Sequence, residues 1–220
     1  MRVWIEAVAG LVFPPARPPR PWPRLERPFC ERCAEPFPRP LAESFVCGNC
    51  GERKWALSRL RAAYLERGTV REAILAFKYR RHFHLRPWLG RWLEDGFRQH
   101  FAAEKWDALV PVPLHPDRKR RRGFNQSAEI AGWLGNRVGL PVVEALRRVK
   151  PTVPQARLSR AERLRNLRGS LALVGRFDPW GKRLVICDDV FTTGATADAC
   201  ARILLREGAK EVVALAVARR

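Results

Sequence analysis

The chain has 220 residues, of which 46% are hydrophobic, and its formal net charge is +20. This length fits one domain, or one domain with a small appendage, and the composition is that of a globular protein. The charge favours anionic partners such as nucleotides, nucleic acid or acidic membrane surfaces, without choosing among them.

The N-terminal part is predicted to be a short helix over residues 1–13, followed by an irregular or extended segment over 14–28 that holds seven prolines. The longest apolar run at this end, 8–13, is too short for a signal peptide or a membrane span. We therefore expect a cytoplasmic protein without a membrane span.

Four cysteines follow in two C-x₂-C pairs: Cys30, Cys33, Cys47 and Cys50. Two such pairs supply four thiolates in tetrahedral geometry, which suits Zn²⁺. Disulfides or free thiols are the alternatives, and a cytoplasmic location disfavours disulfides. Because four thiolates complete the coordination shell, we expect a structural zinc ion in a small module over 29–51 whose folding depends on the metal. Cys187 and Cys200 are expected to be buried bystanders.

The predicted domains are an N-terminal segment with this zinc module over 1–55, a helical connector over 56–105 and a C-terminal domain over 106–220. Within the connector, the apolar positions of 56–79 recur at helical spacing, with a break near Gly68. Residues 85–101 continue as an amphipathic helix.

The C-terminal domain is predicted to be α/β, with a parallel sheet flanked by helices. Short strands are expected over 107–113, 141–145, 171–174, 184–188 and 212–217. Between them lie a basic loop over 118–122, a helix over about 127–136 and a polar excursion over about 150–168. Loops as long as this excursion are functional or disordered.

The most informative stretch runs over 184–196, with the sequence LVICDDVFTTGAT. Four apolar residues predict a buried parallel strand, two adjacent carboxylates follow, and a loop of small residues leads into a helix. The loop amides and the helix N-terminus suit a phosphate, while the carboxylates suit sugar hydroxyls and a divalent cation. The stretch therefore indicates a ribose 5-phosphate with further anionic groups and Mg²⁺; an ordinary strand–turn–helix with surface acids is the alternative.

Positive charge is concentrated beside this stretch. Residues 111–170 contain fourteen Lys or Arg and four Asp or Glu, which gives half of the net charge of the chain. We expect an anion-binding rim for pyrophosphate, a nucleotide or the backbone of single-stranded nucleic acid. Any single arginine of the run can instead simply face solvent.

The stretch over 184–196 resembles the phosphoribosyl pyrophosphate (PRPP) motif of type I phosphoribosyltransferases. Four further features resemble the ComF family: FKYR at 77–80, PVPLHP at 111–116, RGFNQ at 122–126 and LSRAERLRNL at 158–167, all behind the four cysteines. The resemblance covers about 29–218. It implies a type I phosphoribosyltransferase-like domain with an N-terminal zinc ribbon, and a role in the uptake of single-stranded DNA during natural transformation. The related GntX branch is linked to gluconate utilisation.

The resemblance also implies roles for single residues. Asp188 and Asp189 would bind the ribose hydroxyls and Mg²⁺, and 150–168 would close over the site. The residues that would hold the 5-phosphate are Thr192, Thr193, Gly194, Ala195 and Thr196. The turn over 113–116 would meet the pyrophosphate. The basic residues expected to bind nucleic acid or pyrophosphate are Lys78, Arg120, Arg121 and Arg122.

Three functions are compatible with these features. The first is a competence protein that binds PRPP with magnesium and single-stranded DNA, alongside competence-machinery proteins such as a helicase. The second is a true phosphoribosyltransferase that acts on a small base or amine. The third is a zinc-ribbon adaptor that docks protein partners and retains PRPP binding only as a sensor. The sequence contains no recognisable acceptor-base pocket, so it names no catalytic residue.

Overall fold

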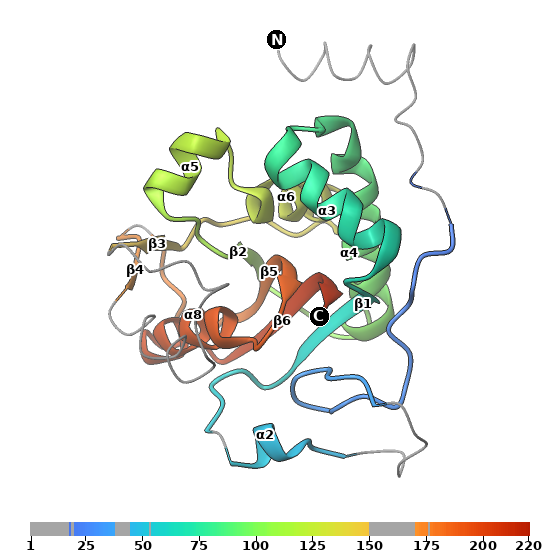
Figure 1. Cartoon of the computed structure of the whole chain (residues 1–220). Helices are drawn as coiled ribbons and strands as arrows, with labels where there is room; N and C mark the ends of the chain where they lie inside the picture. Colours follow the sequence, from blue (N-terminus) through green and yellow to red (C-terminus); the bar gives the residue numbers. More distant parts are fainter. Residues whose placement is uncertain (1–17, 19, 38–44, 53, 150–169, 176) are drawn as a thin grey trace.

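The computed structural model describes residue 18 and residues 20–37, 45–52, 54–149, 170–175 and 177–220 (Figure 1). The helix expected over 1–13 and the excursion over 150–168 lie outside these residues.

A four-stranded parallel sheet forms the centre of the molecule, with the strand order β1-β6-β5-β2 (Figure 1). Its strands are β1 (Leu60–Leu65), β2 (Ala108–Pro111), β5 (Arg183–Phe191) and β6 (Glu211–Arg219). A separate antiparallel pair consists of β3 (Leu146–Arg148) and β4 (Leu171–Leu173). The prediction of an α/β fold with a parallel sheet is confirmed.

Helices cover both faces of this sheet (Figure 1). On one face pack α3 (Gly68–Arg80), the 3₁₀ turn η1 (Phe83–Leu85), α4 (Arg86–His100) and α6 (Gln126–Val138), and on the other packs α8 (Ala195–Arg206). Along β5, Val185 and Cys187 face the first group, whereas Leu184 and Ile186 face α8. Burial on both faces explains why this strand reads as a continuous apolar run.

Residues 60–65 form a strand, so the helix predicted there is wrong. The segment LRAAYL holds alanine, leucine and arginine, which favour helices in isolation, and it contains no β-branched residue. Its place is set by tertiary contacts, because β1 pairs in parallel with β6 along its length and five of its six residues are buried. The sheet thus includes a strand from the segment predicted to be a helical connector.

Two smaller expectations also differ from the structure. Residues 116–122, predicted as part of a loop, form the short helix α5 (Pro116–Arg122), which begins after the side chain of His115 accepts from the Asp117 N–H and ends at Gly123. In the strand expected over 141–145, only Val142 bridges to Leu109 of β2, and regular pairing begins at β3.

The N-terminal module lies along the β1 edge of the sheet, with α2 (Gly48–Gly51) at its end (Figure 1). The Leu60 N–H donates to the Arg32 carbonyl at 2.8 Å, and the Leu25 N–H donates to the Ala63 carbonyl at 3.0 Å. These bonds satisfy backbone groups that an edge strand otherwise leaves open. None of the helices in the described ranges combines the length and hydropathy needed to cross a bilayer.

Candidate functional site

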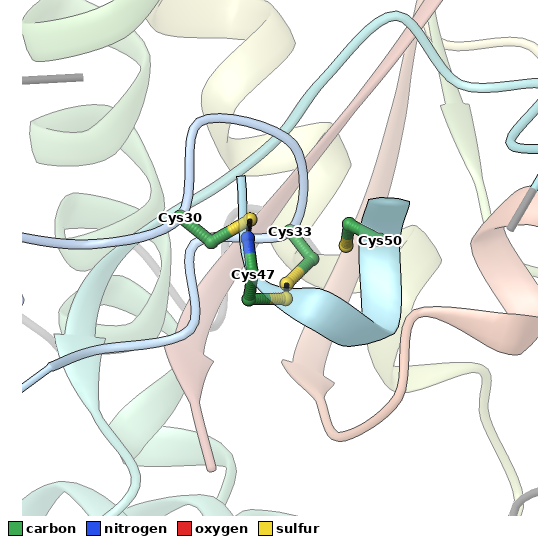
Figure 2. A group of neighbouring side chains, drawn as sticks. All are labelled: Cys30, Cys33, Cys47 and Cys50. Carbon is green, nitrogen blue, oxygen red and sulfur yellow. Dashed lines mark hydrogen bonds between the residues drawn. The ribbon is translucent and has the colours of Figure 1, made fainter. Parts of the chain in front are cut away.

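The four predicted metal ligands lie together, with their side chains directed toward a common centre (Figure 2). Their Sγ atoms all lie within 4.8 Å of one another, and those of Cys33 and Cys47 are 3.8 Å apart. Zn–S bonds of about 2.3 Å in a tetrahedron place sulfur atoms about 3.8 Å apart, so the donor set fits zinc. All four cysteines are buried, and Phe37, Phe45 and Trp55 pack around them.

Local backbone geometry brings each C-x₂-C pair into position. The Ala34 N–H donates to the Cys30 carbonyl, and the Cys50 N–H donates to the Cys47 carbonyl, each at 2.8 Å. Burial acts to raise the pKa of Cys30, but backbone N–H groups, including that of Cys47 at 3.3 Å from the sulfur, lower it to about 7. Burial raises the pKa of Cys33 to about 11. The module therefore favours one thiolate before any metal charge acts on it.

A second site lies beyond the carboxyl ends of β2 and β5, around a cavity of about 230 Å³. Both predicted acids and the whole predicted phosphate loop line it: Asp188, Asp189, Thr192, Thr193, Gly194, Ala195 and Thr196. Pro113 and Leu114, from the turn that the resemblance assigned to pyrophosphate, line it as well. With Lys78 of FKYR and Gln126 of RGFNQ, which also line the cavity, the structure brings together residues from four separate sequence motifs.

The loop between β5 and α8 owes its shape to Gly194. This residue has a φ of +68° and is the N-cap of α8. The Thr193 hydroxyl accepts from the Ala195 N–H at 3.4 Å. A glycine in the left-handed region followed by a helix N-terminus directs successive amides to one side of the backbone, which is a geometry that suits an anion.

The two acids have different surroundings. Asp188 accepts a hydrogen bond from the Ser127 hydroxyl at 2.7 Å, and burial together with the charge of Asp189 raises its pKa to about 7. Asp189 is 3% exposed and forms an ion pair with Lys78 of α3. Burial would raise the pKa of Asp189, but the Lys78 ammonium lowers it.

Lys78 reaches this pair from outside the C-terminal domain predicted over 106–220. Burial would lower its pKa, but the charge of Asp189 raises it. The ammonium therefore stays charged and cancels much of the negative charge of the acids, which would otherwise repel a phosphate.

Three more cations that the sequence analysis did not single out line the cavity: Arg118, Arg148 and Arg220. Arg220 follows β6, and its guanidinium pairs with Glu66 at 2.6 Å. The sequence could have indicated Arg220, because parallel strands such as β5 and β6 bring the residues that follow them to the same edge of the sheet. Arg148 donates to the Pro113 carbonyl at 3.0 Å.

The predicted basic residues of α5 do not line this cavity. Arg120 and Arg121 are exposed, and Arg120 pairs with Asp117. Arg122 bonds to Gln126 and stacks 5.2 Å from the centre of the Tyr79 ring. These side chains form a separate basic surface beside the cavity.

No family model matches the chain. The chain is 30% identical over 200 residues to "Competence protein F" of Haemophilus influenzae, which covers 87% of this chain and 85% of that protein. It is 32% identical over 191 residues to "DNA utilization protein YhgH" of Salmonella typhimurium, with coverage of 84% and 81%.

Among solved structures, the chain is similar to adenine phosphoribosyltransferase from Thermoanaerobacter pseudethanolicus, with 17% identity and a TM-score of 0.36 over 66% of this chain and 84% of that one. The sequence relatives show the family, since two of them are at least 30% identical over more than four fifths of this chain. On that basis, the chain belongs to the ComF/YhgH family of competence and DNA utilization proteins.

Proposed function

We propose that this protein binds PRPP with Mg²⁺ in the cavity at the carboxyl ends of β2 and β5, and single-stranded DNA on the basic surface beside it. In this proposal it acts in the cytoplasm, in DNA uptake during natural transformation. One observation carries the proposal: the acidic pair and the phosphate loop, adjacent in sequence, line a single cavity together with four cations from other elements.

Each part of PRPP has a chemically suited partner. The hydroxyl of Thr192 and the amides after Phe191 would donate to the 5-phosphate at the start of α8. Asp188 and Asp189 would accept from the ribose hydroxyls, since carboxylates accept hydrogen bonds strongly. Lys78, Arg118 and Arg148 would neutralise the pyrophosphate, whose charge is otherwise costly to remove from water.

Magnesium fits the same residues. Hard divalent cations prefer oxygen ligands, and the two adjacent carboxylates supply them at the cavity wall. Bound there with the ligand, Mg²⁺ would neutralise pyrophosphate oxygens, while Asp188 and Asp189 hold the cation and the hydroxyls.

The DNA part of the proposal draws on the relatives and on charge. Two relatives carry the names "Competence protein F" and "DNA utilization protein YhgH". The five consecutive cations 118–122 are presented on α5, and Arg120 and Arg121 are solvent-exposed. Exposed guanidinium groups suit the phosphates of a flexible single strand.

The ligand-binding part is tested by calorimetric titration of the full zinc-loaded chain with PRPP and Mg²⁺. We expect saturable binding that Asp188→Asn weakens about tenfold or more, because hydrogen bonds to a charged acceptor contribute about 1.5–3 kcal/mol. Asp178→Asn is the control, since this exposed carboxylate lies away from the cavity lining. No binding at millimolar PRPP would refute the proposal.

The DNA-binding part is tested by fluorescence anisotropy with a labelled oligothymidylate at several salt concentrations. Arg120→Gln with Arg121→Gln should weaken binding and reduce the slope of log affinity against log salt by about 1.4, since each contact to a single strand contributes about 0.7. Arg71→Gln with Lys210→Gln removes the same charge from other exposed positions and should have a smaller effect. Equal effects of the two pairs would mean that net charge alone drives binding.

The same zinc-loaded protein also distinguishes the two alternative functions, a true phosphoribosyltransferase and a zinc-ribbon adaptor. A true phosphoribosyltransferase would release pyrophosphate from PRPP when offered a panel of bases and amines. An adaptor would neither bind DNA nor release pyrophosphate from PRPP, yet would lose its protein partner when the four cysteines are replaced.

A further inference from the structure

Arg219 connects the four-cysteine module to the strand that leads into the phosphate loop. This penultimate residue of the chain is 5% exposed, although it carries a charge. Its Nε donates to the carbonyl of Cys33 at 3.1 Å, and its Nη1 donates to the carbonyl of Phe191 at 3.2 Å. A further Nη group pairs with Glu35. One guanidinium therefore donates hydrogen bonds both to the backbone of the first cysteine pair and to the backbone at the end of β5.

The contact with Phe191 matters because of the peptide that follows it. The Phe191 carbonyl accepts from Arg219 Nη1 and also from the Arg220 N–H at 3.0 Å. A peptide group is planar, so fixing the direction of this carbonyl also fixes the direction of the Thr192 N–H. That amide is the first of the phosphate loop. Arg219 thus sets the orientation of an amide that the proposal assigns to the ligand, although Arg219 itself does not line the cavity.

Two other contacts join the same regions. Trp55, which packs against the cysteine cluster, also lies against Gly194, where an added Cβ would stand 2.9 Å from its ring. Asp198, in the first turn of α8 and 1% exposed, accepts from the Ala56 N–H at 2.7 Å. The module and its linker therefore contact the loop and the first turn of α8 through Trp55 and Ala56, which do not line the cavity.

We infer that metal binding in the four-cysteine module and PRPP binding in the cavity are energetically coupled, with Arg219 as the positioning residue between them. The inference rests on the proposed function. Each ligand orders groups that the other site shares through Arg219, so each should favour the other by the same factor. When two sites are coupled, binding at one typically changes the affinity at the other by a factor of about five or more.

The first test uses the unmodified full chain loaded with zinc. The rate of zinc release to a chromophoric chelator is measured with and without PRPP and Mg²⁺, and we expect PRPP to slow release about fivefold or more. Asp188→Asn is the control for chelation of zinc by PRPP itself, and at a PRPP concentration that just saturates the wild type this variant should show a much smaller slowing. An unchanged release rate at saturating PRPP would overturn the coupling. An absence of PRPP binding in calorimetry would instead overturn the proposed function, and the coupling with it.

The second test assigns the coupling to Arg219, using zinc-loaded Arg219→Met and Arg61→Met. Arg61 is a matched control, because it is 7% exposed and bonds to Glu31 of the same module at 2.7 and 2.8 Å. Its described hydrogen bonds reach only Glu31 and Leu60. Both variants should release zinc faster, but only Arg219→Met should lower PRPP affinity, by about fivefold or more.

Arg219→Lys keeps the charge and one donor, and should restore part of that PRPP affinity. It also serves as the test variant if Arg219→Met does not fold. Equal losses of PRPP affinity in Arg219→Met and Arg61→Met would indicate a general loss of stability and would overturn the role of Arg219.

Discussion

At the scale of single residues, the cavity depends on a buried charge that comes from another part of the chain. The Lys78 side chain is 17% exposed and that of Asp189 is 4% exposed, so both charges have lost most of their water. Each compensates the other, which explains why the acidic pair can stand at the wall of a cavity that the proposal assigns to an anion. FKYR at 77–80 is thus linked in space to the stretch over 184–196.

Removing one partner of this pair should be costly. We expect Lys78→Met to lower the free energy of unfolding by about 3 kcal/mol, because it leaves a buried carboxylate without its cation. Urea unfolding measures this. Arg80→Met, on the same helix but exposed, should change stability by less than about 0.5 kcal/mol. The double variant Lys78→Met/Asp189→Asn should recover part of the loss; a purely additive double variant would contradict the coupling.

His100 gives the fold a pH-dependent element. Burial, with the nearby charge of Arg61, lowers the pKa of His100 to about 4. The unfolded chain therefore binds this proton more readily than the folded chain, so the contribution of His100 to stability is present above about pH 6.5 and is lost as pH falls toward 4. We expect the urea midpoint of the wild type to fall relative to that of His100→Phe as the pH is lowered from about 6.5 to about 4. A difference independent of pH would contradict the lowered pKa.

At the scale of elements, prediction succeeded where the local pattern and the tertiary environment agreed. The strand and helix around 184–196 have an apolar run, a glycine and helical spacing, and the structure contains β5 and α8 there. Prediction failed at β1, because its residues favour a helix in isolation and form a strand only through pairing with β6. Arg118, Arg148 and Arg220 were missed because arginines are common on surfaces, and only the sheet order shows which of them meet at the cavity.

The turn between β5 and α8 should tolerate no side chain at Gly194. Alanine there would adopt a left-handed conformation and bring its Cβ to 2.9 Å from the Trp55 ring. We expect Gly194→Ala to cost about 1–3 kcal/mol of stability in urea unfolding. Gly132→Ala in α6 is the control, since the added methyl group meets nothing within 4 Å, and it should stabilise the protein by up to about 1 kcal/mol. Equal changes in stability in Gly194→Ala and Gly132→Ala would show that a side chain at position 194 does not strain the turn.

At the scale of the whole molecule, a small module is attached to one edge of a sheet that has its own core. The sheet and its helices form two large hydrophobic clusters, one on each face, whereas the cysteines form a third, small cluster. A cluster this small supplies little hydrophobic stabilisation, so we expect a metal bound to the four cysteines to provide much of the folding free energy of the module.

Zinc removal should therefore act unevenly across the molecule. After treatment with a strong chelator, we expect hydrogen–deuterium exchange to rise over 29–51 and at the amides of β1 that bond to the module, such as that of Leu60. The amides of Val185 and Val213, in the central strands, should remain protected because both residues are fully buried. Loss of protection throughout the chain would contradict a sheet that is stable without the module.

The order of the strands has a consequence for biosynthesis. β1 and β2 lie at the two ends of the hydrogen-bonded order, while β5 and β6, which separate them, are translated after both. A nascent chain therefore exposes its outer strands on the ribosome before either has a neighbour to pair with, and it completes the sheet only after β5 and β6 have been synthesised. All four cysteines emerge before β1 does. The cysteines that would bind a metal ion are thus synthesised before the strand that pairs with β1.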